Sequence, residues 1–235
     1  MFSKLDDIYN SPMSVKEIPL PKYNLAQELW NSISHGLGSV LTLIFGPFLL
    51  IKAAQTGDPW KIVSCSIYVF CLLLLFTCSC LYHALARNNG KRVFRVIDHN
   101  MVYALIMGTY APYCLVALNS YNPWLCWIIF GSVLVGGILG IVFNSIDIHK
   151  YRRFCMIAYL LMGWAIVGSM YPLCEAMGGF FPGPCLLLIG GLLFTIGAIF
   201  YGIGGRKNPW MHTVFHFFVL AGAMAMFASV YFYVI

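Results

Sequence analysis

Seven apolar stretches, each close to the length that a helix needs to cross a bilayer, recur along the 235 residues of this chain. A spanning helix needs about 20 predominantly apolar residues. The sequence therefore predicts an all-α integral membrane protein, a seven-transmembrane helix bundle over residues 33–235 that follows a tail over 1–32. The stretches run over 33–54, 62–83, 97–118, 124–143, 154–174, 185–203 and 211–235.

The low charge content excludes an ordinary soluble enzyme. Hydrophobic residues make up 60% of the chain and charged residues 9%, whereas soluble domains average about 25% charged residues. So few charges would leave large apolar patches on a surface that faces water. The loops between the stretches are short, so no room remains for a separate soluble catalytic domain.

The basic residues predict the orientation of the bundle. Twelve lie in the tail and in the loops that follow the even-numbered stretches, against two, Lys52 and Lys61, on the other side. Under the positive-inside rule, this split predicts a cytoplasmic N-terminus and a C-terminus outside. The net charge of +6 then marks a face that meets anionic lipid headgroups, and it requires no nucleic-acid partner. The twelve are Lys4, Lys16, Lys22, Arg87, Lys91, Arg92, Arg95, Lys150, Arg152, Arg153, Arg206 and Lys207.

Cysteines and small residues are interpreted as packing residues. Seven of the nine cysteines are scattered through the apolar stretches, where Cys behaves as a small hydrophobe. Cys174 and Cys185 flank one outward loop and are the one candidate pair, although no disulfide is predicted. Ser132, Gly136 and Gly140 recur every four residues, a stripe that allows two helices to approach closely.

The histidines lie at one membrane face. His212 and His216 are four residues apart, so both imidazoles project from one side of the last helix and can chelate one metal ion. Ser79 and His83 have the same spacing at the end of the second stretch, and Asp98 opens the third. If these three helices are neighbours, three imidazoles and a carboxylate converge just below the cytoplasmic surface.

Three histidines with a water in the fourth position define an open zinc site of the catalytic type, because structural sites normally use four protein ligands. Asp98 then serves best as a general base toward that water. A single histidine at a helix end is more often an interfacial polar residue. Ionisable groups inside spans tend to be functional, however, and the joint pattern favours a metal site. His149, beside Lys150 in a basic loop, is interpreted as solvated surface.

Glu28, Asn31 and His35 are spaced by three and four residues and therefore share one helical face. They are candidates for a second shell that orients the metal ligands. For Glu28, a cap at the start of the helix is an equally good interpretation, since acidic groups favour helix N-termini. His99 is either a gate residue or a simple neighbour of the site.

Several motifs together resemble the hemolysin III family, the bacterial branch of the progestin and adipoQ receptor superfamily. The resemblance covers almost all of residues 23–235, in order and with the right helix count. The matching blocks are Glu28-x-x-Asn31-x-x-Ser34-His35, Ser79-x-x-x-His83, Asp98-His99 followed by Tyr103 and Gly108-Thr109-Tyr110-Ala111-Pro112, and His212-x-x-x-His216. One departure is Met226-Phe227, where the family often carries a His before Phe.

The resemblance implies a seven-helix bundle with a zinc ion held at the positions of His83, His212 and His216. It places Asp98 beside the metal-bound water and Ser79 close by. Asp98 and Ser79 are then the expected catalytic residues, with Asp98 taking the proton of the water and Ser79 hydrogen-bonding the tetrahedral oxyanion. It also implies an expected activity, the hydrolysis of an amide or ester in a membrane lipid, similar to the ceramidase-like activity attributed to related receptors. Two alternatives stay open at this stage: a membrane-lytic, pore-forming hemolysin, and a non-enzymatic receptor or sensor in which zinc is structural. The expected location is the cell membrane.

Overall fold

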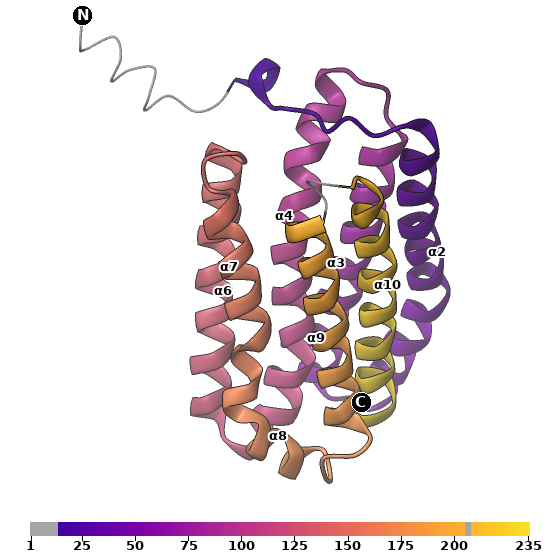
Figure 1. The fold of residues 1–235 in the computed structure, drawn as a ribbon. Helices are drawn as coiled ribbons and strands as arrows, with labels where there is room; N and C mark the ends of the chain where they lie inside the picture. Colours follow the sequence, from indigo (N-terminus) through magenta and orange to yellow (C-terminus); the bar gives the residue numbers. More distant parts are fainter. Residues whose placement is uncertain (1–13, 205–207) are drawn as a thin grey trace, which may run out of the picture.

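The computed structural model describes residues 14–204 and 208–235, and within them it is entirely helical. Seven helical segments of this described part are long and apolar enough to span a membrane, as the sequence predicts. The chain is therefore a seven-span, all-α membrane protein. In Figure 1 the long helices run roughly side by side, and the N-terminal segment crosses one end of the bundle.

Four of the spans contain a 3-10 or π-helical segment next to the regular helix. The first, second and fourth spans, by contrast, are single α-helices. A 3-10 turn, η1 (Val15–Glu17), precedes them. The elements are α2 (Leu25–Gln55), α3 (Pro59–Ala84), α4 (Asn89–Pro112) continued by η2 (Tyr113–Leu118) and α5 (Asn119–Tyr121), α6 (Pro123–Ile146), α7 (Arg152–Trp164) continued by η3 (Ala165–Ser169) and α8 (Met170–Ala176), α9 (Gly183–Ile199) with η4 (Phe200–Gly204), and α10 (Trp210–Ser229) with η5 (Val230–Val234).

The first helix begins at Leu25, earlier than the start at residue 33 that apolarity alone predicts. The reason is a capping box. The Asn24 side chain accepts from the Gln27 amide at 2.9 Å, and the Gln27 side chain accepts from the Asn24 amide at 2.9 Å. The box satisfies amides that would otherwise lack partners, so the helix includes a polar turn that carries Glu28. Residues 1–13 of the predicted tail lie outside the described residues.

The third span, which α4 begins, is the most buried part of the bundle. Along the chain α2 packs on α3, α3 on α4, α4 on α6, and α9 on α10, and α10 returns to α2. In the most apolar window of the third span 67% of residues are buried, against 39% or less in the other six spans. The third span is therefore the central one. Figure 1 shows α6 and α7 on the side of the bundle away from α2 and α10.

Glycines allow the close approach of α4 to α6. A Cβ atom at Gly140 would lie 2.2 Å from the Tyr103 ring, and one at Gly137 would lie 2.5 Å from Met107. Both distances are shorter than a non-bonded contact allows. The flexible Met107 side chain can shift away from Gly137, whereas the buried Tyr103 ring leaves no room for a Cβ at Gly140. Of the predicted stripe, Gly140 lies at this contact, whereas Gly136 faces Met162 of α7 and Ser132 is exposed.

The outside of the bundle is apolar, as a lipid-facing surface has to be. Leu43, Phe70, Ile128 and Leu161 are each more than 60% exposed. A soluble protein would not expose large apolar side chains over every helix. All nine cysteines, which lie within the described residues, are free, so Cys174 and Cys185 do not form a disulfide here.

The positively charged residues gather at the end of the bundle crossed by the N-terminal segment. Of the twelve that carry the orientation argument, Lys4, Arg206 and Lys207 lie outside the described residues. Arg87, Arg92 and Arg95 bind the backbone of that N-terminal segment. The charge distribution therefore continues to predict that this end faces the cytoplasm.

Candidate metal centre

Three buried histidines from two helices converge at this end of the bundle. His83 lies in the last turn of α3, and His212 and His216 lie in the first two turns of α10. Each is 5% exposed or less. One ring nitrogen from each lies within 4.8 Å of the other two, the geometry of a group that can hold a metal ion. The neighbourhood of the second and seventh spans, assumed from the sequence, is thus present.

The nitrogens that approach one another most closely are the Nε2 atoms. Nε2 of His212 lies 3.3 Å from Nε2 of His83 and 3.1 Å from Nε2 of His216. Neutral imidazole carries one N–H and one lone pair. Where all three Nε2 atoms present lone pairs, a cation between them would remove their mutual repulsion. The arrangement therefore fits a positively charged ion.

Glu28 fixes the orientation of His83. The Glu28 carboxylate lies 2.7 Å from Nδ1 of His83, so this nitrogen carries the proton and donates it, which leaves the Nε2 lone pair free for a metal. The Asn31 amide nitrogen is 3.4 Å from the same Nδ1, too far to compete with the carboxylate. Both residues lie on α2, on the face that the sequence predicts.

Lys91 completes this polar chain and was not predicted to belong to the site. Its ammonium group lies 2.8 Å from the second Glu28 oxygen and donates to the backbone carbonyl oxygens of Leu85, at 3.0 Å, and His83, at 3.4 Å. The residue is 2% exposed. The Lys91 charge thus neutralises Glu28 and caps the last carbonyls of α3. A carboxylate in a helix at a membrane face needs a counter-charge. The sequence could therefore have indicated that a basic residue pairs with Glu28.

His35 packs against the site without a hydrogen bond. Its ring centroid lies 3.9 Å from that of His216 and 5.2 Å from that of Phe76. Neither ring nitrogen of His35 has a hydrogen-bond partner among the described residues. His35 therefore holds His216 in place by ring contact.

Asp98, Ser79 and His99 face a cavity beside the histidines. The cavity has a volume of about 470 Å³, and its lining also includes His35, His212 and His216. The Ser79 side chain is the polar neighbour of the Asp98 carboxylate, although its hydroxyl makes no full hydrogen bond with any described residue. The structure thus brings the predicted catalytic pair to the same cavity as His212 and His216.

His99 is held apart from the three ligands by its own hydrogen bonds. Its Nδ1 donates to the Arg95 carbonyl oxygen at 2.8 Å, so its Nε2 accepts from the Tyr201 hydroxyl at 3.3 Å. Both nitrogens are used, and His99 serves as a wall of the cavity mouth beside Asp98. His149 is exposed, as predicted for a solvated loop residue.

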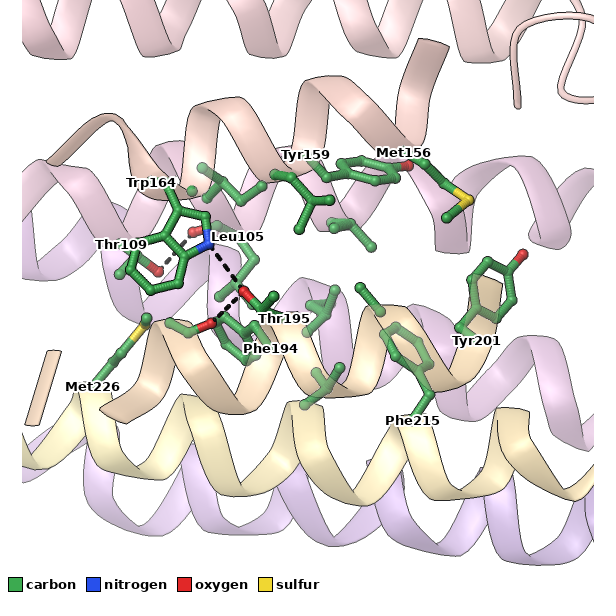
Figure 2. A pocket seen from close by; sticks show the side chains of 18 of the residues that line it. Leu105, Thr109, Met156, Tyr159, Trp164, Phe194, Thr195, Tyr201, Phe215 and Met226 are labelled. Atoms are coloured by element: carbon green, nitrogen blue, oxygen red, sulfur yellow. Dashed lines mark hydrogen bonds between the residues drawn. The ribbon is translucent and has the colours of Figure 1, made fainter. Parts of the chain in front are cut away.

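Away from the histidines the cavity is lined almost entirely by apolar side chains. Figure 2 shows Tyr201 and Met156 toward one end and Trp164, Thr109 and Met226 toward the other. The Trp164 indole donates to the Thr195 hydroxyl at 3.0 Å across α7 and α9. The cavity thus has one polar end, at the histidines, and a long apolar body suited to a hydrocarbon chain.

Fold and site together define a multi-pass membrane protein with a buried three-histidine centre near one face. The chain belongs to the haemolysin-III related family, whose sequence model matches residues 23–227. It is 36% identical over 211 residues to the hemolysin-3 homolog of Bacillus subtilis (strain 168), covering 90% of this chain and 96% of that protein. It is 34% identical over 209 residues to hemolysin-3 of Bacillus cereus, covering 89% and 92%. A human relative, the monocyte to macrophage differentiation factor, is 24% identical over 206 residues, covering 83% and 79%.

Proposed function

We propose that this protein is a zinc-dependent hydrolase of a membrane lipid amide or ester, located in the cell membrane with the metal centre near the cytoplasmic face. The observation that carries the proposal is one shared cavity. It has imidazoles that can hold a metal ion and a carboxylate at its polar end, and an apolar body that can take a hydrocarbon chain. A soluble substrate would not require an apolar cavity of this kind.

Zinc is favoured over other cations by the donor set and the spacing. Neutral imidazole is a common zinc ligand, whereas calcium and magnesium prefer oxygen. Two nitrogens bound tetrahedrally to one zinc ion at the usual distance lie about 3.3 Å apart. The two measured separations, 3.3 Å and 3.1 Å, agree with that value. The residues proposed to hold the ion are His83, His212 and His216, with Glu28, Asn31 and His35 around them.

The chemistry divides among the residues of this chain. A zinc ion at the three histidines would polarise the scissile carbonyl and make a water more acidic. Asp98 accepts a proton from the attacking water and passes it to the leaving nitrogen or oxygen as the carbon–nitrogen or carbon–oxygen bond breaks. The Ser79 hydroxyl, which lacks a full hydrogen bond in the described structure, donates to the carbonyl oxygen as charge develops there. The apolar cavity holds the acyl chain.

The decisive experiment compares wild type with Asp98→Asn. Purified protein in vesicles of defined composition is analysed for bound metal and for lipid products by mass spectrometry. We expect equal zinc content and a loss of turnover of about 10²- to 10⁴-fold in Asp98→Asn. Equal turnover in the two proteins would falsify the proposed hydrolase.

Two other outcomes identify the alternative functions. Vesicle leakage that is unchanged by Asp98→Asn and His216→Ala, without lipid products, would indicate the membrane-lytic activity that the name of the Bacillus cereus relative suggests. Bound zinc without turnover in wild type would indicate a structural ion in a receptor or sensor. Glu175→Gln is the matched control, because Glu175 is an exposed carboxylate outside the site.

A further inference from the structure

The segment over residues 18–23, here called the strap, lies across the end of the bundle above the metal centre. Figure 1 shows it running over the ends of the helices before α2 begins. Its sequence, Ile-Pro-Leu-Pro-Lys-Tyr, contains two prolines. Proline lacks an amide donor and favours an extended chain, so such a segment offers carbonyl oxygens and needs few acceptors in return.

Three arginines bind four consecutive carbonyl oxygens of the strap. Arg92 donates to Ile18 and Arg95 donates to Pro19. Arg87 donates to Leu20 at 3.3 Å and to Pro21 at 2.6 Å. Among the described residues, none of these arginines forms an ion pair with a carboxylate. The hydrogen bonds of their guanidinium groups described here therefore go to the strap.

The last residue of the strap reaches a metal ligand. The Tyr23 ring lies parallel to the His212 ring, with centroids 5.2 Å apart and planes inclined by 7°. It also lies 5.9 Å from the His83 ring. The capping box formed by the next residue, Asn24, fixes the direction in which the chain leaves the strap. Tyr23 is thus held at both ends, by the arginines before it and by the helix cap after it.

We infer that Tyr23 is a positioning residue for the metal centre and that the strap covers the side of the metal centre that faces water. The ion then leaves toward the cytoplasm only when the strap detaches. This inference rests on the proposed metal site. Nδ1 of His212 has no hydrogen-bond partner among the described residues, so no polar contact orients this ring as Glu28 orients His83. The stacked Tyr23 ring takes that role for His212.

Metal binding strengthens the stack. An imidazole that gives its lone pair to a cation becomes electron-poor, and the face of a phenol ring attracts such a group. The arrangement favours the closed strap when the ion is present.

The test measures the rate at which zinc passes from the loaded, full-length protein to a chelator in detergent. Tyr23→Ala should release zinc about 2- to 10-fold faster, the range expected for one aromatic contact. Tyr23→Phe keeps the ring and should release zinc at the wild-type rate. Tyr171→Ala is the matched control, because Tyr171 is an exposed tyrosine on another helix. Equal release from Tyr23→Ala and wild type would overturn the inference.

A second variant tests the strap without changing Tyr23. Arg87→Ala removes two of the four carbonyl contacts and should also accelerate zinc release, whereas Arg153→Ala, at an exposed arginine, should not. In cobalt-loaded protein, the absorption bands of the bound ion should change in Tyr23→Ala and be restored in Tyr23→Phe. Unchanged release from Arg87→Ala, or unchanged cobalt bands in Tyr23→Ala, counts against the strap.

The outcomes separate this inference from the proposed metal site. If wild-type protein binds no zinc, or if His216→Ala binds as much as wild type, the metal site itself is wrong. If wild type binds zinc through these histidines but Tyr23→Ala releases it at the same rate, the site stands and only the role of the strap is wrong.

Discussion

The Glu28 carboxylate lies 2.7 Å from Nδ1 of His83, although the two residues are 55 positions apart. The contact joins the first span to the second and decides which nitrogen of His83 is available to a metal ion. A carboxylate behind a metal-binding histidine also raises the basicity of the ligand. Glu28 lies in the first turn of α2 and also contacts His83, so its position agrees with a helix start, and its second-shell role remains a prediction.

Replacing this carboxylate should weaken metal binding without unfolding the bundle. Glu28→Gln keeps the size of the side chain but removes the charge that holds the Nδ1 proton. Second-shell changes of this kind typically cost about 10- to 100-fold in metal affinity. The measurement is a competition titration with a chelator of known affinity. Glu175→Gln should bind like wild type, and equal affinity for Glu28→Gln would show that the carboxylate does not act through His83.

Removing the Lys91 charge should destabilise the fold, because it leaves the partly buried Glu28 carboxylate with His83 as its one remaining partner. The Lys91 ammonium is 2.8 Å from Glu28 and is almost fully buried. Breaking a buried pair on one side costs about 3 kcal/mol. Lys91→Met should therefore lower the free energy of unfolding by about that amount, measured by detergent-induced unfolding. The double variant Lys91→Met/Glu28→Gln should lose less free energy of unfolding than the sum of the two single variants, because it leaves neither charge without its partner. Strict additivity would contradict the pairing.

The sequence predicted the parts of the site that follow helix periodicity. Spacing of four residues places His212 and His216 on one face, and the same spacing relates Ser79 to His83. Apolar length predicted all seven spans. Helix ends were predicted less well, because polar turns such as the one at Asn24 are stabilised by caps that a search for apolar residues does not count.

Contacts between distant segments could not be predicted from the sequence in the same way. Lys91 and Arg92 are adjacent and equally basic, and both count as cytoplasmic charges. In the structure Lys91 turns inward to Glu28 while Arg92 binds the backbone of Ile18. The choice depends on which helix lies beside α4, and periodicity carries no information about that. Tyr23 was missed for the same reason, since its partner His212 lies at the other end of the chain.

Filling the apolar body of the cavity should reduce lipid turnover and leave the metal in place. Ala198 lines the cavity from α9, and Ala198→Phe would occupy space assigned to the acyl chain. Displacing a bound substrate by about 1 Å can cost about 10²-fold in rate. Leu192→Phe, on an exposed position of the same helix, is the control. We expect normal zinc content in both variants and loss of turnover in Ala198→Phe alone; full turnover there would remove the cavity from the proposal.

The contact between α4 and α6 should not tolerate a single methyl group at Gly140. The added Cβ would lie 2.2 Å from the Tyr103 ring, and that ring is fully buried. Overpacking of this kind costs about 1–3 kcal/mol. Gly131 lies on the same helix with nothing within 4 Å of its Cβ position. Thermal denaturation in detergent should show a lower midpoint for Gly140→Ala and no loss for Gly131→Ala. Equal midpoints would mean that the two helices pack less closely than described.

Removing the metal should loosen the bundle, because the proposed ligands join two helices. His83 lies on α3 and the other two ligands lie on α10. An ion that binds only the folded state stabilises it by about 4 kcal/mol when its free concentration is 1,000 times its dissociation constant. A chelator should therefore lower the melting midpoint of wild type but not that of His216→Ala, and His149→Ala should respond like wild type. If wild-type protein that has demonstrably lost its metal melts as before, the ion does not tie the two helices together.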